Sequence, residues 1–116
     1  MTYEEIVSMV RDNMENADAR EIFEHIAFQI NITGEGSGAF YIEVAERSVC
    51  VEPYDYYDRD GLVTADAKAI LDIATGKIGI NESIERGFIQ FEGNPNKLLA
   101  FRKMKLRKKK VSKTQK

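Results

Sequence analysis

The acidic side chains of residues 54–60 are the first candidates for chemistry in this sequence. Asp55, Asp58 and Asp60 are interspersed there with tyrosines. Several oxygens on one short loop suit Ca²⁺, but the spacing does not follow the EF-hand pattern. Paired carboxylates can also act as general acid and base, yet the sequence places no nucleophile or base beside them. We therefore expect a solvated loop whose tyrosines fold over the edge of a sheet, with calcium binding as the weaker alternative.

The only histidine and the only cysteine are the next candidates. His25 and Cys50 alone cannot build the usual zinc sites, and Cys50 cannot form an internal disulfide. We expect His25 to be structural at the start of a strand, Cys50 to pack as a small residue, and the chain to be cytoplasmic. The Gly34-x-Gly36-x-Gly38 run joins two predicted strands, so it lacks phosphate-binding geometry. The sequence thus predicts no enzyme, no catalytic residue, no metal site and no cofactor.

The charge of the chain is unevenly distributed. Residues 102–116 hold nine Lys or Arg and no acid, which leaves residues 1–101 with eight bases, nineteen acids and a net charge of −11. We expect one domain over residues 1–106 and a basic, disordered tail over residues 107–116. The positive charges of the tail either only interact favourably with the dipole of a preceding helix or hold the protein against an anionic membrane. Nucleic acid is disfavoured, because the acidic body repels phosphate and the tail lacks aromatics for stacking.

Two helices are predicted at the N-terminus. Thr2 and Glu5 match a capping box, which satisfies free N–H groups at the start of a helix. Asn16 is predicted to cap a shorter second helix with Ile22 and Phe23 facing inward. The apolar face of the first helix comprises Tyr3, Ile6, Val7, Val10 and Met14.

The middle of the chain has the period of strands. Apolar and polar residues alternate over residues 26–33 and again over residues 40–44, and the glycines of residues 34–38 form a hairpin loop between them. Residues 49–51 are predicted as a third strand, and Leu62 and Val63 as a fourth.

The last third returns to helices around one strand. Thr64 is predicted to cap a helix over residues 65–75, and residues 80–86 form a short helix. Residues 88–92 are predicted as a strand, after which Asn94 caps a helix with Pro95 at its first position. Its apolar stripe comprises Leu98, Leu99, Phe101 and Met104. The order of elements predicts an α+β domain with a largely antiparallel sheet and its helices on one face.

Several of these runs resemble one family of lipid-binding domains. The run Ile32-Thr33-Gly34-Glu35-Gly36-x-Gly38-Ala39-Phe40-Tyr41 is similar to the first hairpin of the sterol carrier protein 2 (SCP2) family. Thr64-Ala65-Asp66, Gly76-Lys77-Ile78, Gly87-Phe88-Ile89-Gln90-Phe91-Glu92-Gly93 and Leu98-Leu99 follow in the family's order, so the resemblance covers roughly residues 24–104. Gly79-Ile80 and Asn94 depart from the family's usual residues, and a Ser-Lys-Leu ending is absent.

The resemblance implies an SCP2-like fold of about five strands, with an apolar tunnel between the sheet and its helices. It implies a non-enzymatic protein that binds or transfers a fatty acid, a fatty acyl-CoA or a sterol-like lipid. Burial contributes about 0.8 kcal/mol per CH₂ group, so a chain of about a dozen carbons supplies enough for micromolar binding before entropy losses are counted. The alternative is an accessory module that binds a lipid-metabolism enzyme, and a homodimer is left open.

The resemblance also implies which residues line the tunnel, although the sequence alone favours ordinary core at each single position. The expected lipid-binding residues are Phe28, Ile30, Phe40, Ile42, Ile70, Ile73, Ile84, Ile89, Phe91, Leu98, Phe101 and Met104.

Overall fold

A computed structural model describes residues 1–106, which contain five strands and four helices. The predicted basic tail, residues 107–116, lies outside the described residues. In the described part, no helix combines the length and the hydropathy that a membrane span requires. The elements in chain order are α1 (Tyr3–Met14), β1 (Ile26–Thr33), β2 (Gly38–Ala45), β3 (Ser48–Glu52), β4 (Gly61–Asp66), α2 (Ala67–Ala74), α3 (Ile80–Glu85), β5 (Ile89–Gly93) and α4 (Pro95–Phe101).

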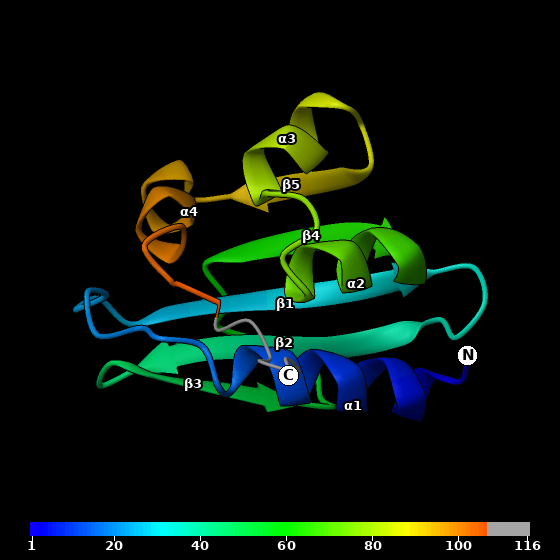
Figure 1. Cartoon of the computed structure of the whole chain (residues 1–116), viewed down its shortest axis with the longest axis horizontal. Helices are drawn as coiled ribbons and strands as arrows, with labels where there is room; N and C mark the ends of the chain where they lie inside the picture. Colours follow the sequence, from blue (N-terminus) through cyan, green and yellow to red (C-terminus); the bar gives the residue numbers. More distant parts are fainter. Residues whose placement is uncertain (107–116) are drawn as a thin grey trace, which may run out of the picture.

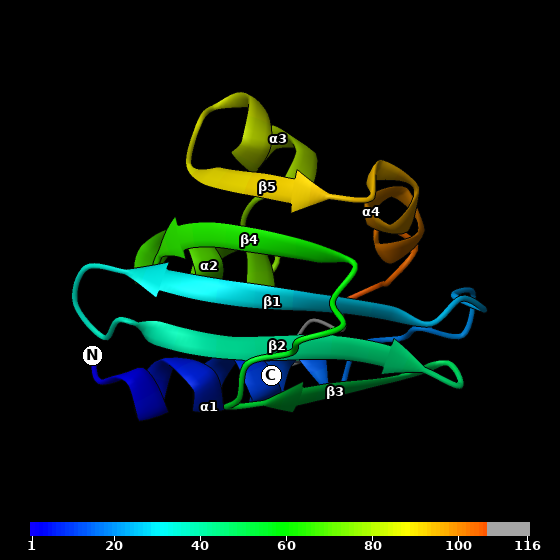
Figure 2. The same cartoon turned by 180° about the vertical axis from the view of Figure 1, so that it is seen from behind.

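The five strands form one mixed sheet in the order β3-β2-β1-β4-β5 (Figure 1). β1 pairs with β4 in parallel, and the other three pairs are antiparallel. The parallel pair arises because residues 53–60 cross the back of the sheet from β3 to β4, as Figure 2 shows. The α+β class and the largely antiparallel sheet are therefore confirmed.

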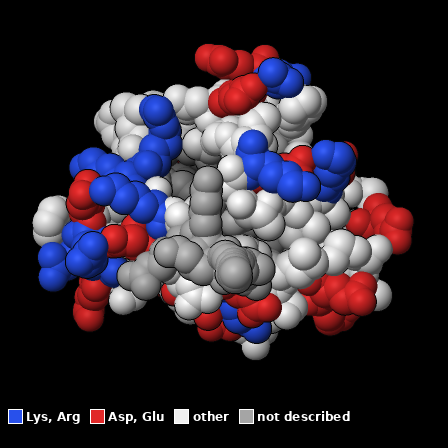
Figure 3. Space-filling model, in the orientation of Figure 1, with Lys and Arg blue, Asp and Glu red and all other residues white. Residues whose placement is uncertain are grey.

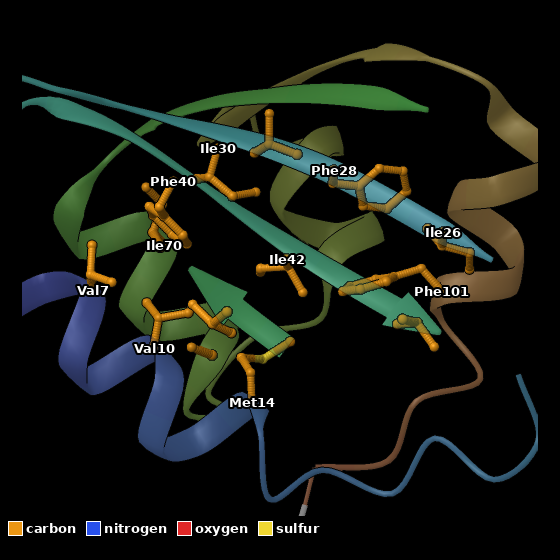
Figure 4. Close-up of a cluster of buried hydrophobic side chains, with 14 of the residues drawn as sticks. Val7, Val10, Met14, Ile26, Phe28, Ile30, Phe40, Ile42, Ile70 and Phe101 are labelled. Atoms are coloured by element: carbon orange, nitrogen blue, oxygen red, sulfur yellow. The ribbon is translucent and has the colours of Figure 1, made fainter. Parts of the chain in front are cut away.

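One face of the sheet carries the core, and α1 and α2 lie over that face (Figure 1). Along β2, Phe40, Ile42 and Val44 are buried while the residues between them are only half-buried, as strand alternation requires. Side chains from α1, β1, β2 and α2 point toward one another in this layer, with Phe101 closing one end (Figure 4). The fold thus places an apolar layer between sheet and helices.

The ends of α1 and α4 confirm two predicted caps. Thr2 Oγ1 accepts from the Glu5 N–H at 3.1 Å, and Glu5 Oε1 accepts from the Thr2 N–H at 2.8 Å. In α4, Asn94 Oδ1 accepts from the Asn96 N–H at 2.9 Å, and Pro95 occupies the first helical position. Both helices begin where the sequence predicts.

The predicted second helix is wrong. Residues 16–24 form turns, and Asp18 makes an antiparallel bridge with Lys105, with N···O distances of 2.7 and 2.9 Å. Ile22 is buried as expected, but Phe23 is 76% exposed and lies under the Arg47 guanidinium. Pairing with the far end of the chain replaces the local helix at this point.

Two further boundaries differ from the sequence prediction. Thr64 belongs to β4, and Asp66 caps α2 by accepting from the Ala69 N–H at 2.9 Å. α4 ends at Phe101, so Met104 lies beyond it, and Leu99 is 57% exposed. The predicted apolar stripe is therefore wrong at Leu99, which faces solvent.

Candidate binding site

A small apolar cavity lies between the sheet and the helices. Its volume is about 50 Å³, and none of residues 1–106 that line it is polar. Such a cavity offers water no hydrogen-bonding partners, so it stays dry. Its walls come from α1, β1, β2, β4, α2, the start of α3, β5 and the end of α4, and Figure 4 shows several of these side chains pointing inward. The lining residues are Val10, Met14, Phe28, Ile30, Ile42, Val63, Ile70, Ile73, Ala74, Ile80, Ile89 and Phe101.

A larger outer pocket adjoins this cavity. It has a volume of about 340 Å³ and lies among the ends of α1 and α2, the start of α3 and the chain after α4. Met14, Ile73, Ile80 and Phe101 line both hollows, so their side chains form the partition between them. The outer pocket is further lined by Gly76, Ile78, Gly79, Asn81, Arg102, Met104 and Leu106.

The two volumes set what each hollow can hold. An apolar cavity of about 150 Å³ is enough for benzene. The inner cavity is about a third of that size, whereas the outer pocket is more than twice as large. A hydrocarbon chain therefore has room in the outer pocket, but it reaches the inner cavity only if the partition side chains move. Residues 1–106 thus line two adjoining hollows, and a continuous tunnel stays a prediction.

Eight of the twelve expected lipid-binding residues lie at these hollows. Seven of the eight line the inner cavity, and Met104 lines the outer pocket. The remaining four of the twelve pack into the core without lining either hollow. Phe91, one of these four, stands edge-on to the ring of Phe28 at a centroid distance of 5.4 Å. Those lining the inner cavity are Phe28, Ile30, Ile42, Ile70, Ile73, Ile89 and Phe101. Those lining neither are Phe40, Ile84, Phe91 and Leu98.

Sequence reasoning missed several lining residues. Val10 and Met14 belong to the predicted apolar face of α1, but nothing in the sequence shows that α1 closes the cavity beside α2. Val63 could have been found from strand alternation, because it is the inward residue of β4. Asn81 and Arg102 have no apolar signal at all.

The acidic segment makes local contacts. Asp60 accepts from the Ala27 N–H at 2.9 Å, while Asp55 and Asp58 are exposed. Tyr56 folds over the sheet, with its ring edge-on to Tyr41 at 4.8 Å, but Tyr54 and Tyr57 point into solvent. The expected packing of tyrosines on the sheet therefore holds for Tyr56 only.

The single histidine and cysteine have local partners too. His25 Nε2 lies 2.5 Å from Glu43 Oε2 at the surface, just before β1. Burial raises the pKa of the Cys50 thiol to about 11, so the thiol is protonated at neutral pH and is a poor nucleophile. Within residues 1–106, no three His, Cys, Asp or Glu side chains gather in a way that could hold a metal ion.

Comparisons with known proteins agree with this geometry. A model of the SCP-2 sterol transfer family matches residues 6–105. No curated protein sequence matches the chain. The crystal structure of sterol carrier protein 2 like 2 from Aedes aegypti is 19% identical, with a TM-score of 0.57 over 86% of this chain and 89% of that one.

Two further solved structures share the fold. The solution structure of palmitated SCP2L2 from Aedes aegypti is 19% identical, with a TM-score of 0.61 over 89% of this chain and 93% of that one. A structure described as the ubiquinone synthesis protein UbiJ-SCP2 is 18% identical, with a TM-score of 0.63 over 87% and 90%. At these identities the likeness concerns the fold, whereas the family match covers nearly the whole described chain. The chain therefore belongs to the SCP-2 sterol transfer family.

Proposed function

We propose that this protein binds a long-chain lipid between its sheet and its helices, without catalysing a reaction. The observation that carries this proposal is the pair of adjoining hollows, of which the inner is lined by apolar residues and the outer mainly by apolar residues. Membership of the SCP-2 sterol transfer family supports lipid binding in general. No described residue in the lining is a nucleophile or a general base, so what the lining can do is bury hydrocarbon.

The ligand that fits best is a flexible acyl chain. The inner cavity is narrower than a space that accepts one aromatic ring, so a rigid sterol requires more rearrangement than a chain does. The palmitated Aedes aegypti neighbour supports the same preference. Each buried CH₂ group contributes about 0.8 kcal/mol and association costs at least about 4 kcal/mol, so a chain of about a dozen carbons binds with a Kd on the order of 0.1 mM, and micromolar affinity needs about sixteen carbons.

Loading requires movement at the partition. Phe101 is 9% exposed and ends α4, and the segment that follows is held to residue 18 by the short bridge through Lys105. A displacement of α4, or of residues 76–87 on the other side of the outer pocket, opens the inner cavity. We propose that a lipid tail enters from the outer pocket and reaches Phe28 once Phe101 turns away.

The remaining proposals concern the setting of the protein. We propose a cytoplasmic location, which the single cysteine supports. An accessory role beside a lipid-metabolism enzyme is the second function considered for this fold, and no specific observation favours it. Such a role would show as a co-purifying enzyme with no bound lipid.

Native mass spectrometry of the full chain after mild purification tests the proposal. We expect one lipid per chain, identified after extraction. Added palmitate at ten times its Kd contributes about 1.4 kcal/mol to the free energy of unfolding, which raises the melting temperature by roughly 5 °C. If extraction releases no lipid and palmitate leaves the melting temperature unchanged, the proposal is wrong.

A further inference from the structure

Arg102 is the one charged side chain among the described residues that line the outer pocket. Asn81 is the only other residue of that lining with a polar side chain. Arg102 follows α4 directly, and Asn81 lies in the first turn of α3, so two different helices bring these side chains to the pocket. A lining that is otherwise hydrocarbon and glycine thus has its polar groups concentrated in one place.

Asn81 holds the guanidinium of Arg102 in position. With its amide oxygen facing Arg102, Asn81 Oδ1 accepts from Nη1 at 2.9 Å and from Nη2 at 3.2 Å. A guanidinium has five N–H donors, so donors remain for a ligand. Arg11, Arg20 and Arg86 each pair with a carboxylate.

Arg102 differs from these three arginines. Within residues 1–106, no carboxylate lies within 4.0 Å of its guanidinium. The charge of the guanidinium is therefore not neutralised by a described acid. A charge oriented at the rim of an apolar pocket can instead pair with an anionic ligand.

The surroundings of Arg102 are basic. Lys103 and Lys105 follow it, and blue side chains gather over α4 in Figure 3. The two acids that share a surface hollow with Lys103 already pair with other bases, Glu21 with Lys105 at 3.2 Å and Asp18 with Arg20 at 2.9 Å. Lys103 and Arg102 therefore remain as an excess of positive charge. This charge attracts anions toward the mouth of the outer pocket.

We infer that Arg102, oriented by Asn81, binds the carboxylate of a fatty acid whose tail runs through the outer pocket toward the inner cavity. This inference rests on the proposed function. A guanidinium matches a planar carboxylate through two parallel N–H···O bonds, a geometry that an alcohol cannot reproduce. No second cation lines the pocket in the described part of the chain, so a phosphate dianion finds fewer partners there than a carboxylate does. The ligand is therefore a long-chain carboxylic acid bound tail-inward, and neutral lipids bind more weakly.

Calorimetric titration of the full chain with dodecanoate and with dodecan-1-ol tests the inference, because the two probes differ only in the head group. The test variant is Arg102→Gln. The matched control is Arg86→Gln, which makes the same charge change at the residue that follows α3 and lies away from both hollows. The melting temperature of each variant is measured alongside to confirm folding.

The wild-type protein is expected to bind dodecanoate about tenfold more tightly than dodecan-1-ol. Arg102→Gln should weaken dodecanoate binding about tenfold and leave dodecan-1-ol binding unchanged, while Arg86→Gln matches the wild type. Equal wild-type affinity for the two probes, or equal losses in the two variants, overturns the inference and leaves lipid binding intact. Failure of the folded wild type to bind either probe overturns the inference and the proposed function together.

Discussion

The ring of Phe101, the last residue of α4, packs against the ring of Phe28 in β1, with centroids 5.1 Å apart and planes tilted by 55°. Phe101 also lines both the inner cavity and the outer pocket. Phe101 therefore ties α4 to the sheet and is one of the four side chains that lie between the two hollows. If lipid enters as we propose, its tail displaces this contact to reach the inner cavity.

Replacing Phe101 with Ala should join the two hollows. We expect a loss of about 3 kcal/mol in the free energy of unfolding, at the low end for a buried Phe because one side of the ring already faces empty space. Long acyl chains should bind more tightly, because the tail gains access to the inner cavity without moving a ring. Urea denaturation and palmitate titration measure the two effects.

Leu99→Ala is the control for this change, since Leu99 lies on the same helix but is 57% exposed. It should alter the free energy of unfolding by no more than about 0.5 kcal/mol and leave palmitate binding unchanged. If Phe101→Ala, while still folded, binds palmitate less tightly than the wild type, Phe101 contacts the bound ligand and does not block its entry.

Filling the inner cavity should weaken lipid binding while preserving the fold. Ala74 lines the cavity from α2, so Ala74→Leu puts its added carbons into a space of about 50 Å³. We expect a change of about 1 kcal/mol or less in stability, because the added group occupies space that is already empty, and at least a tenfold weaker affinity for palmitate. Calorimetric titration and thermal melting measure these quantities.

Ala67→Leu serves as the matched variant, because Ala67 begins the same helix and lines neither hollow. It should bind palmitate as the wild type does. Equal palmitate affinity in both variants would show that the tail stays in the outer pocket and never reaches the inner cavity.

Asp66, and not Thr64, should account for the stability of the start of α2. Asp66→Ala removes a cap that accepts from the Ala69 N–H, and we expect it to lower the free energy of unfolding by about 1 kcal/mol. Thr64→Val should change it little, because Thr64 is a half-buried strand residue and valine suits a strand. Urea denaturation of the two variants measures both values. A larger loss of stability in Thr64→Val than in Asp66→Ala would show that Thr64 is the cap.

Most of the sheet and most helix starts could be predicted from local sequence. The alternation of Phe28, Ile30 and Ile32 sets β1, and Thr2 and Asn94 mark helix starts because side-chain capping depends only on the adjacent residues. Asn16 carries the same local signal, yet no helix follows it. Backbone pairing of residue 18 with Lys105 is a long-range contact, and local propensity contains no information about it.

The candidate site was harder to predict than the fold. Periodicity shows that Phe40 and Ile42 both face the helices, but only Ile42 reaches the cavity, because a gap depends on how side chains from several elements meet. The parallel pairing of β1 with β4 and the position of α1 determine which of these side chains pack against one another. In the sequence, Arg102 is only one residue of a basic run. Its contact with Asn81 depends on how α3 and α4 are placed, which the sequence does not show.

Ionisation of Cys50 should lower stability at high pH. Burial raises the pKa of the folded thiol from 9.0 to about 11, so between about pH 9 and 11 the unfolded chain has lost the proton that the folded chain keeps. The free energy of unfolding then falls as pH rises through this window. Urea denaturation of the wild type and of Cys50→Ala separates the contribution of the thiol to the pH dependence from that of the tyrosines, because both proteins contain the same tyrosines. The wild-type value should decline relative to the variant, and a constant difference across the window would contradict the assignment.

The most direct test of lipid binding is a nuclear Overhauser measurement on the full chain mixed with ¹³C-labelled dodecanoate. We expect contacts from the tail carbons to Ile73, Ile80 and the ring of Phe101, with one lipid bound per chain. Contacts only to the opposite face of the sheet, such as Tyr41 or Tyr56, or no contacts at all, would contradict a lipid seat between the sheet and its helices.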